Sequence, residues 1–295
     1  MATQVKSPMK KYTIEQFNQQ FPDEDTCLEF LRNKLYPAKI YCQNCEKPTK
    51  HHKISGRKVY GCDYCGNQVS PTAGTIFHKS STALRLWFYA IYLMAQTRTG
   101  ISAKQLEREL GVTYKTAWRM FTMIRSRLDE GLDAFSGNVE ADETYVGGYR
   151  KGERGRGGSS KTAVFGVVER KGKVKAVVVP DVKKSTIIPI VENQVEKGST
   201  VHTDEYQSYK SLTSKGYTHE RILHSSGIFA AGNVHTNSIE GFWAQVKNAV
   251  RGVHHGVAPE YLQMYVNEYA FRYNHRNDTA LMFLTFLDRV GIPLE

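Results

Sequence analysis

Three acidic side chains in the second half of the sequence have the types and the spacing for metal-dependent chemistry on a phosphodiester. Asp142 lies in an alternating segment that predicts a β-strand, and Asp204 ends a second predicted strand. Glu240 lies in a predicted helix, with 35 residues between it and Asp204. Three converging carboxylates repel one another unless cations lie between them, and such oxygen ligands suit Mg2+. Two Mg2+ ions ~4 Å apart could activate a water or a 3′-hydroxyl and stabilise the leaving oxygen, and Mn2+ could substitute.

A lysine lies near one of these acids in the sequence, and other acidic residues are alternative candidates for the metal-binding positions. Lys247 lies seven residues after Glu240, two helical turns on and on nearly the same helix face. A cation there could hold a phosphate next to the metal ions. A glutamate on a helix surface is often only solvated, and each aspartate has acidic neighbours. The alternatives are Glu140, Glu143 and Glu205.

Four of the five cysteines form two pairs, Cys42-x2-Cys45 and Cys62-x2-Cys65, with 16 residues between the pairs. Each pair places two thiolates on one tight turn, and two such turns can complete a tetrahedral four-cysteine site for Zn2+. Because sulfur would fill every position, this zinc would be structural. Two disulfides, or cysteines that only pack, are the alternatives, and an intracellular chain disfavours disulfides. The nearby histidines that could compete as ligands are His51 and His52.

Helical patterns follow the cysteines. Residues 82–96 are apolar almost all round, which predicts a buried helix. In the next helix Ser102 is a candidate N-cap and Gly111 ends it, and a further helix begins at Thr113. Two short helices joined through a glycine-containing turn are typical of the DNA-binding helix-turn-helix, although an ordinary helical hairpin with a solvated face is the alternative. The residues expected to face DNA are Tyr114, Lys115 and Arg119.

The segments that must position the acids alternate between strand and helix patterns. Three consecutive strands, a helix, a parallel return strand and later helices describe a ribonuclease H-like α/β fold. In such a sheet the first and fourth strands are neighbours, so Asp142 and Asp204 could meet. The expected strands are residues 138–146, 162–169, 173–179 and 200–204, and the expected helices are 185–196 and 237–250.

Composition and charge restrict the class of protein. The 295 residues are 40% apolar and 23% charged, which excludes a disordered chain, a fibrous repeat and a small disulfide scaffold. A formal net charge of +11 suits a polyanionic partner such as nucleic acid. The longest uncharged apolar run, Leu86 to Ala95, has ten residues, against the ~20 that cross a bilayer. No secretory signal is apparent, so a cytoplasmic protein, associated with the nucleoid through DNA and not with a membrane, is expected.

Taken together, this order of motifs resembles the prokaryotic insertion-sequence transposases that combine a zinc ribbon with a DDE catalytic domain, the insertion sequence 1595 family with an ISXO-like transposase domain. The resemblance covers nearly the whole chain, from Phe21 to Asn274. The segments that read like family signatures are 73–78, 117–120, 142–148, 203–206 and 235–243.

The resemblance implies a DNA transposase that recognises the terminal inverted repeats of its own element, cuts there and transfers the ends to target DNA. It implies that Asp142, Asp204 and Glu240 bind Mg2+ and that Lys247 contacts a phosphate. Bringing two DNA ends together implies a homodimer or a larger assembly. Related enzymes vary at the third acidic position, where Asn or His can replace the acid, and this sequence keeps Glu240. The weaker candidates near Glu240 are therefore Asn237 and His235.

Two other functions compete with transposition. One is a non-catalytic DNA-binding regulator derived from a transposase, and the other is a purely hydrolytic nuclease of the same fold. An intact acidic set favours an enzyme, because a protein that only binds DNA does not need it. The expected organisation is an N-terminal helical segment, a zinc ribbon, a helix-turn-helix region, a ribonuclease H-like domain and a C-terminal tail, at residues 1–38, 39–80, 81–130, 138–280 and 281–295.

Overall fold

The computed structural model divides the chain into two compact units. Unit 1 comprises Met1–Arg127 together with Asp278–Glu295, and unit 2 comprises Leu128–Asn277. Among the described residues, no helix is both long enough and apolar enough to cross a membrane. The residues that the structure describes are 12–97, 99–147, 161–222, 235–277 and 282–291.

Unit 1 combines helices with two small sheets of short strands. Its described elements are α1 (Ile14–Gln20), α2 (Glu24–Leu35), β1 (Ile40–Cys42), β2 (Lys47–Thr49), β3 (His51–Lys53), β4 (Tyr60–Cys62), β5 (Gln68–Val69), α3 (Leu84–Gln96), α4 (Ala103–Leu110), α5 (Tyr114–Ser126) and α9 (Met282–Val290). β1 pairs antiparallel with β2, and β4 lies between β3 and β5 in a second antiparallel sheet. These strands hold the turns that carry the paired cysteines.

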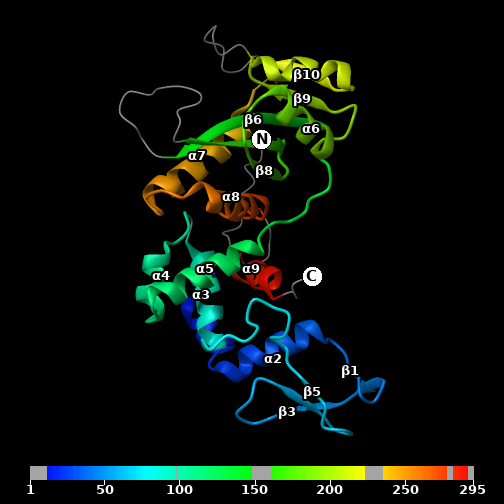
Figure 1. Ribbon diagram of the computed structural model, residues 1–295, viewed down its shortest axis with the longest axis vertical. Helices are drawn as coiled ribbons and strands as arrows, with labels where there is room; N and C mark the ends of the chain where they lie inside the picture. Colours follow the sequence, from blue (N-terminus) through cyan, green and yellow to red (C-terminus); the bar gives the residue numbers. More distant parts are fainter. Residues whose placement is uncertain (1–11, 98, 148–160, 223–234, 278–281, 292–295) are drawn as a thin grey trace, which may run out of the picture. The chain divides into compact units, whose positions relative to one another are not determined.

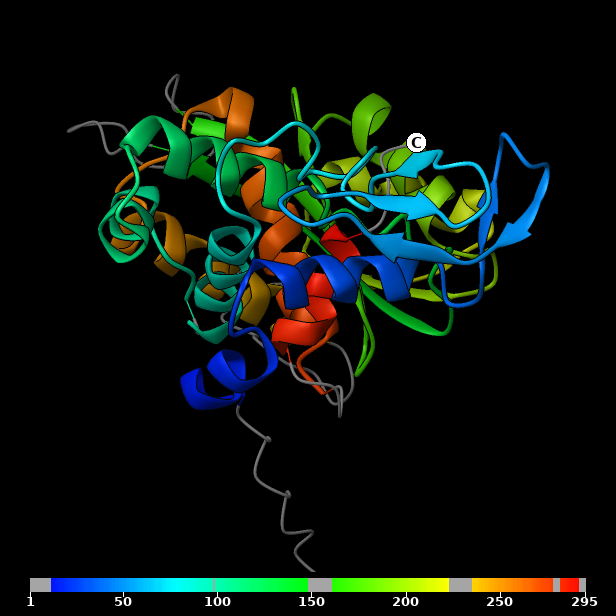
Figure 2. The same cartoon turned by 90° about the horizontal axis from the view of Figure 1, so that it is seen from below.

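Helix α3 packs in the core of unit 1. Most of its side chains are buried, as the apolar pattern at residues 82–96 predicts. α9, which comes from the C-terminal segment, packs against α3, and the Phe283 ring contacts those of Phe17 and Tyr92. α2 and α9, which lie near each other in the ribbon views (Figure 1, Figure 2), are joined by an ion pair between Lys34 and Asp288. A segment remote in sequence therefore completes the core of unit 1.

Helix α4 begins and ends, and helix α5 begins, where the sequence predicts. Ser102 Oγ accepts a hydrogen bond from Gln105 N at 3.1 Å at the start of α4. Gly111 ends α4 with a φ of 64°, a conformation that a residue without Cβ adopts without strain. Thr113 Oγ1 then accepts from Thr116 N at 3.3 Å and caps α5.

Unit 2 is built on a mixed sheet, which has five strands in the part of the chain that the structure describes. Its elements are β6 (Asn138–Gly147), β7 (Lys161–Glu169), β8 (Val174–Val179), α6 (Lys184–Gln194), β9 (Thr200–Thr203), η1 (Gln207–Ser211), η2 (Thr213–Lys215), β10 (Thr218–Arg221), α7 (Asn237–Gly252) and α8 (Pro259–Asn274). The strand order is β10-β9-β6-β7-β8. β6, β7 and β8 are antiparallel, whereas β9 runs parallel to β6 and β10 runs parallel to β9. The first and fourth predicted strands are therefore neighbours, as expected.

Apolar layers cover both faces of this sheet. α6 and η1 pack on one face, and α7 and α8 pack on the other (Figure 1). Val139 and Ala141 of β6 belong to the first layer, and Val146 belongs to the second. Because side chains alternate along a strand, Asp142 faces α7 and Glu143 faces the opposite layer.

Candidate active site and zinc centre

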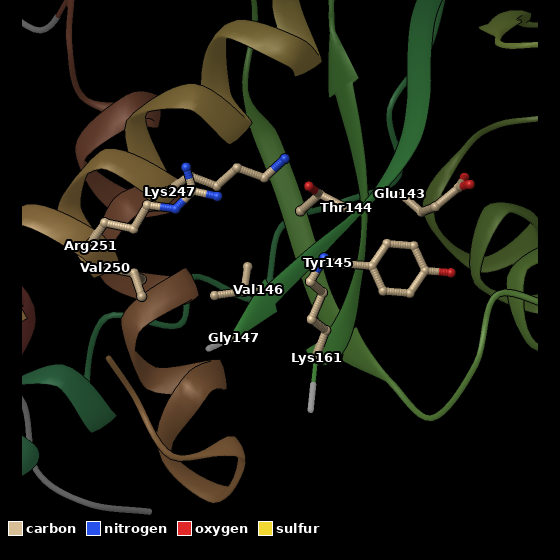
Figure 3. A pocket seen from close by; sticks show the side chains of 9 residues that line it. All are labelled: Glu143, Thr144, Tyr145, Val146, Gly147, Lys161, Lys247, Val250 and Arg251. Atoms are coloured by element: carbon tan, nitrogen blue, oxygen red, sulfur yellow. The ribbon is translucent and has the colours of Figure 1, made fainter. Parts of the chain in front are cut away.

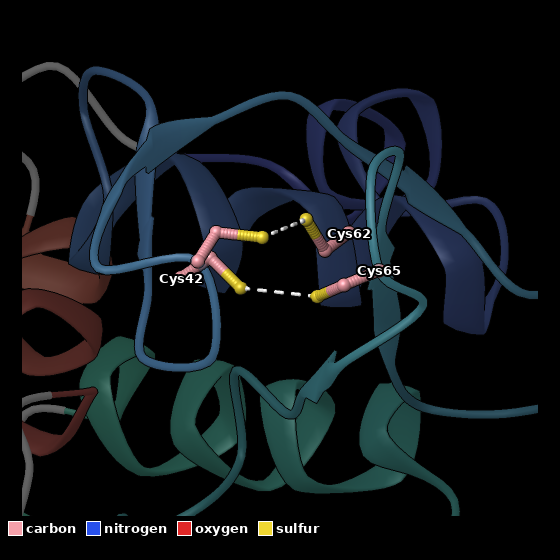
Figure 4. A group of neighbouring side chains, drawn as sticks. Cys42, Cys62 and Cys65 are labelled. Atoms are coloured by element: carbon pink, nitrogen blue, oxygen red, sulfur yellow. Dashed lines mark hydrogen bonds between the residues drawn. The ribbon is translucent and has the colours of Figure 1, made fainter.

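The paired cysteines come together in unit 1 (Figure 4). Cys42 Sγ lies 3.5 Å from Cys65 Sγ, and Cys45 Sγ lies 3.9 Å from Cys62 Sγ. These separations exceed the ~2.05 Å of a disulfide bond. All four Sγ atoms lie within 4.8 Å of one another. Tetrahedral Zn–S bonds of about 2.3 Å would hold sulfurs about 3.8 Å apart, so this group fits one Zn2+.

Neighbouring groups influence the protons on these sulfurs. Thr49 Oγ1 lies 3.3 Å from Cys62 Sγ, and this contact lowers the pKa of the Cys62 thiol to about 6. Sulfur contacts, first of all that with Cys65, raise the pKa of Cys45 to about 12. A zinc ion would displace the remaining protons, because thiolate sulfur is its ligand.

The two histidines near the cysteines have other partners. His51 Nδ1 lies 3.2 Å from the Thr49 carbonyl oxygen, and His52 Nδ1 lies 2.8 Å from Asp63 Oδ1. Neither belongs to the four-sulfur group. The group therefore consists of sulfur donors alone.

A tryptophan holds Asp142 on the face of the sheet that α7 covers. Asp142 of β6 lies opposite Gly166 of β7. Trp243 Nε1, from α7, donates a hydrogen bond to Asp142 Oδ2 at 3.1 Å. The indole can lie this close to the sheet because Gly166 has no side chain, and a Cβ there would lie 2.8 Å from two Trp243 ring atoms. The sequence pattern does not reveal this contact between distant segments.

Other acids surround Asp142. Burial, followed by the negative charges of Glu143, Asp204 and Glu240, raises the pKa of Asp142 to about 7. The charges of Asp204 and Glu240 therefore reach Asp142, whereas their joint role as metal ligands stays a prediction. Among the described residues, only the cysteines form a cluster tight enough to hold a single ion.

Local hydrogen bonds orient the other two acids. Asp204 follows β9, and its Oδ1 accepts a hydrogen bond from Tyr206 N at 2.8 Å. Glu240 lies exposed in the first turn of α7, and its Oε1 accepts from Thr236 Oγ1 at 2.8 Å. Negative charge is favourable in the first turn of a helix. Asn237, a weaker candidate, is an exposed residue at the start of the same helix.

Glu140, an alternative to Asp142, has a different position in the structure. Its side chain is fully buried. Its Oε2 accepts from Ser238 N at 2.8 Å and from Ile239 N at 3.1 Å, and its Oε1 accepts from Ser238 Oγ at 3.0 Å. A carboxylate is favourable here because the N–H groups in the first turn of a helix lack partners within the helix. Glu140 thus ties α7 to the strand that carries Asp142.

A partly exposed cationic side chain, that of Arg170, contacts the same carboxylate. Arg170 Nε donates to Glu140 Oε1 at 2.9 Å, and Arg170 Nη2 donates to the His235 carbonyl oxygen at 2.8 Å. His235 Nδ1 lies 3.2 Å from Glu140 Oε1. The structure therefore places His235 beside Glu140. Strand alternation puts Glu140 on the same face as Asp142, but the sequence gives no sign of its bonds to α7.

The other two alternative acids, Glu143 and Glu205, differ in their burial and hydrogen bonding. Glu143 Oε2 accepts a hydrogen bond from Tyr209 OH at 2.6 Å, on the sheet face that α6 covers. Burial, and then the charge of Glu143, raises the pKa of Tyr209, so the phenol remains a donor. Glu205 follows Asp204 and is partly exposed.

A pocket of about 390 Å3 begins at Glu143, the residue that follows Asp142 on β6 (Figure 3). It is lined by residues 143–147 of β6, by Lys161 of β7, and by Lys247, Val250 and Arg251 of α7. Burial lowers the pKa of Lys247, whereas the charge of Asp142 opposes this shift. The charge of Asp142 therefore reaches Lys247, and the sequence did not single out Lys161 and Arg251, which line the same pocket.

The side chains expected to face DNA lie on one exposed surface of α5. Tyr114, Lys115 and Arg119 are all exposed. The Lys104 ammonium lies 5.7 Å from the centre of the Tyr114 ring, and the Arg119 guanidinium lies 6.0 Å from a ring of Trp87. Exposed cationic side chains therefore lie near the exposed Tyr114 ring, whereas Trp87 is buried, and such a surface is compatible with a nucleic-acid contact.

Comparison with known proteins identifies the family. A family model described as an ISXO2-like transposase domain matches residues 134–274, and one described as a transposase zinc-ribbon domain matches residues 22–68. An uncharacterized transposase-like protein of Haemophilus influenzae is 35% identical over 105 residues, which are 36% of this chain and 84% of that protein. The chain belongs to the insertion sequence 1595 family of ISXO2-like transposases. The motif order predicted this membership.

Other similarities of this family member are more distant. An uncharacterized protein in the transposable element ISH50 of Halobacterium salinarum is 29% identical over 271 residues, 85% of this chain and 91% of that protein. The simian T-cell lymphotropic virus intasome, in complex with the PP2A regulatory subunit B56 gamma, contains a chain with 12% identity and a TM-score of 0.29. The match covers 56% of this chain and 63% of that one. A chain of the Mos1 strand transfer complex has 12% identity and a TM-score of 0.23. That match covers 63% of this chain and 75% of the Mos1 chain.

Proposed function

We propose that the chain is a metal-dependent DNA transposase whose unit 2 is a ribonuclease H-like catalytic domain. The observation that carries this proposal is the grouping of Asp142 with Asp204 and Glu240, which come from β6, the end of β9 and α7. The strand order of the sheet and the family membership support it. Three carboxylates offer hard oxygen ligands and repel one another without cations, so this donor set fits Mg2+, and Mn2+ can substitute.

The chain's own residues would orient the reacting groups. Mg2+ bound by Asp142, Asp204 and Glu240 would supply a Lewis acid and lower the pKa of the attacking water or hydroxyl. Trp243 holds the carboxylate of Asp142, and Lys247 would bind a phosphate oxygen of the same strand. In cleavage, a water oxygen bonds to phosphorus as the bond to the 3′-oxygen breaks, which frees a 3′-hydroxyl. In joining, that hydroxyl attacks a target phosphorus and displaces the target's own 3′-oxygen.

Unit 1 would recognise the ends of the element. α4 and α5 would act as a helix-turn-helix, with Tyr114, Lys115 and Arg119 toward DNA, and the zinc ribbon would add further contacts.

Contacts to DNA phosphates make binding affinity depend on salt. The logarithm of the binding constant falls against the logarithm of the salt concentration with a slope of about −0.9 per contact. We expect Arg119→Ala to weaken binding to end DNA and to reduce this slope by about one if the guanidinium binds a phosphate. Lys210→Ala, an exposed residue of unit 2, is the charge-matched control.

The catalytic assignment is tested by exchanging single acids. DNA fragments carrying each boundary of the element are incubated with purified protein and Mg2+ or Mn2+, and cleaved and joined strands are measured. Asp142→Asn, Asp204→Asn and Glu240→Gln should each abolish both products while DNA binding is retained. Glu205→Gln makes the same charge change beside Asp204 and should retain cleavage. Equal cleavage by the wild type and Asp142→Asn would overturn the assignment.

The same assay separates the competing functions. A wild-type protein that binds end DNA but cuts it with neither metal ion is a DNA-binding regulator. Cleavage without joined products indicates a hydrolytic nuclease. Transposition also requires two ends in one complex, so we expect a homodimer or a larger assembly on DNA, which mass measurement of the protein–DNA complex would detect.

A further inference from the structure

The pocket beside the candidate active site is lined by three cationic side chains. Lys247 and Arg251 lie one turn apart on α7, and Lys161 begins β7 (Figure 3). The end of β6 forms the floor between them. A volume of about 390 Å3 lies within the range of roughly 300–1,000 Å3 that is typical of ligand sites. The pocket is therefore large enough for a nucleotide-sized group.

These cations have no ion-pair partner within the described part of the chain. No described salt bridge includes Lys161, Lys247 or Arg251. Arg251 and Lys161 add to the lowering of the pKa of Lys247, which is caused first by burial. Glu143 is the carboxylate in the lining, and its Oε2 accepts the hydrogen bond from Tyr209. Clustered positive charges repel one another, and a bound anion relieves that repulsion.

The pocket continues from the candidate catalytic acids along the same elements. Asp142 directly precedes the lining residues 143–147 on β6, and Lys247 lies seven residues after Glu240 on α7. β9 pairs with residues 138–140 of β6, so it leaves the later part of that strand uncovered on this edge. From Asp142 to Gly147 a strand extends about 17 Å at ~3.3 Å per residue. This length exceeds the 3.4 Å that one DNA strand advances per nucleotide, so the segment is long enough to lie alongside the phosphate next to the one at Asp142.

We propose that this pocket binds a phosphodiester of the DNA strand being cut, next to the linkage held at Asp142, through Lys161, Lys247 and Arg251. This inference rests on the proposed function and adds a substrate subsite to it. The guanidinium suits two oxygens of one phosphate, and the lysines act as point charges. Contacts to phosphate carry no base information, so the pocket sets the position of the strand without reading its sequence.

The test neutralises one phosphate of the DNA and, separately, two of the cationic side chains proposed to bind it. Boundary DNA is prepared with a single neutral methylphosphonate linkage at each of several positions on either side of the cut. The full-length wild type is compared with a Lys161→Gln, Arg251→Gln double variant, and cleavage rates are measured with Mg2+. The charge-matched control is a Lys184→Gln, Lys210→Gln double variant, which changes exposed residues outside the pocket lining.

We expect one neutral linkage next to the cut to slow the wild type and the control by about tenfold, the scale of a lost charge-assisted contact. The pocket variant should cut charged DNA more slowly and show no further loss on that neutral linkage. The inference is overturned if no linkage matters to the wild type, or if the pocket variant keeps the wild-type sensitivity. It is also overturned if inorganic phosphate inhibits the wild type while no neutral linkage slows its cleavage. The pocket would then hold free phosphate rather than a phosphodiester of the DNA.

Failure of the proposed function gives a different result. If the wild type cuts no DNA with either metal ion, the transposase assignment fails, and the same DNAs are used for binding measurements. The subsite is then supported if the neutral linkage weakens binding by the wild type but not by the pocket variant. It is overturned if both proteins lose the same affinity.

Discussion

Among single residues, Asp142 stands out because the pKa of its carboxyl group is strongly raised. Burial and three neighbouring carboxylates, those of Glu143, Asp204 and Glu240, hold its pKa near 7, well above the usual range. The folded protein therefore binds a proton that the unfolded chain releases between about pH 4 and pH 7. A bound cation would compete with this proton for the same oxygens, so metal affinity and pH are coupled at this site.

This coupling predicts how stability depends on pH without divalent cations. Because the Asp142 pKa is higher in the folded state, its contribution favours folding at low pH and is lost as the pH rises toward about 7. The Tm of the wild type should fall more between about pH 5 and pH 7.5 than the Tm of Asp142→Asn, and Mg2+ should reduce the fall in the wild type. Calorimetry of both proteins measures this difference. Identical pH profiles would contradict the assigned pKa.

A second residue-scale prediction concerns Gly166. Its missing side chain leaves room for Trp243, so Gly166→Ala forces the indole to move and should destabilise the protein by about 1–3 kcal/mol. Loss of the Trp243 bond to Asp142 should also reduce cleavage. Gly241→Ala, on α7, is the matched control, because its Cβ would meet nothing within 4 Å and alanine favours a helix. Urea unfolding should show this difference, and equal effects would contradict the packing argument.

Among the elements, α7 determines the geometry of the candidate site. It carries Glu240, Trp243 and Lys247 on successive turns, and the buried carboxylate of Glu140 holds its first turn against β6. A rotation or shift of this helix would therefore move all three side chains together relative to Asp142. The bonds from Glu140 act on the helix as a unit, rather than on any one functional group.

Removing the charge of Glu140 should loosen this attachment. Glu140→Gln removes the buried charge that accepts the bonds from Arg170 and α7 and should cost about 1.5–3 kcal/mol of stability, the range for hydrogen bonds to charged groups. Ser238→Ala removes one donor and should cost about 1 kcal/mol. If Glu140 positions α7, both variants should require more Mg2+ for half-maximal cleavage while end binding is kept. An unchanged Mg2+ requirement in folded Ser238→Ala would contradict this role.

For the whole molecule, two compact units divide the proposed tasks between DNA recognition and chemistry. The sulfur cluster lies in unit 1, and the acids lie in unit 2. Each unit has its own core, so each should respond separately to loss of the metal that it uses. Structural zinc contributes directly to folding, because its ligands are brought together only in the folded state.

Removal of zinc should therefore affect one unit more than the other. Cys62→Ser, or a zinc chelator, should abolish bound zinc, lower the Tm of one thermal transition and weaken binding to end DNA at least about tenfold. The transition of unit 2 should keep its Tm. Cys27→Ala is the control, since Cys27 lies outside the sulfur group and should retain one zinc per chain. Zinc analysis and calorimetry measure both effects, and a shift of both transitions would contradict independent units.

The amino-acid sequence alone was sufficient to predict features that depend on near neighbours. The cysteine spacing indicated the sulfur cluster, caps and glycine marked α4 and α5, and alternation located β6 with Asp142 on it. These features are predictable because turns, caps and strand faces depend on residues only a few positions apart. The order of strands and helices also indicated that β6 and β9 are neighbours.

Only the tertiary structure decided contacts between remote segments. It paired Trp243 with Asp142 across 101 positions, bonded Ser238 to Glu140 across 98, and placed α9 in unit 1. It also grouped Lys161 with the cations of α7. No local pattern specifies such contacts, because they form when the elements pack and the best burial of the whole chain selects which faces meet.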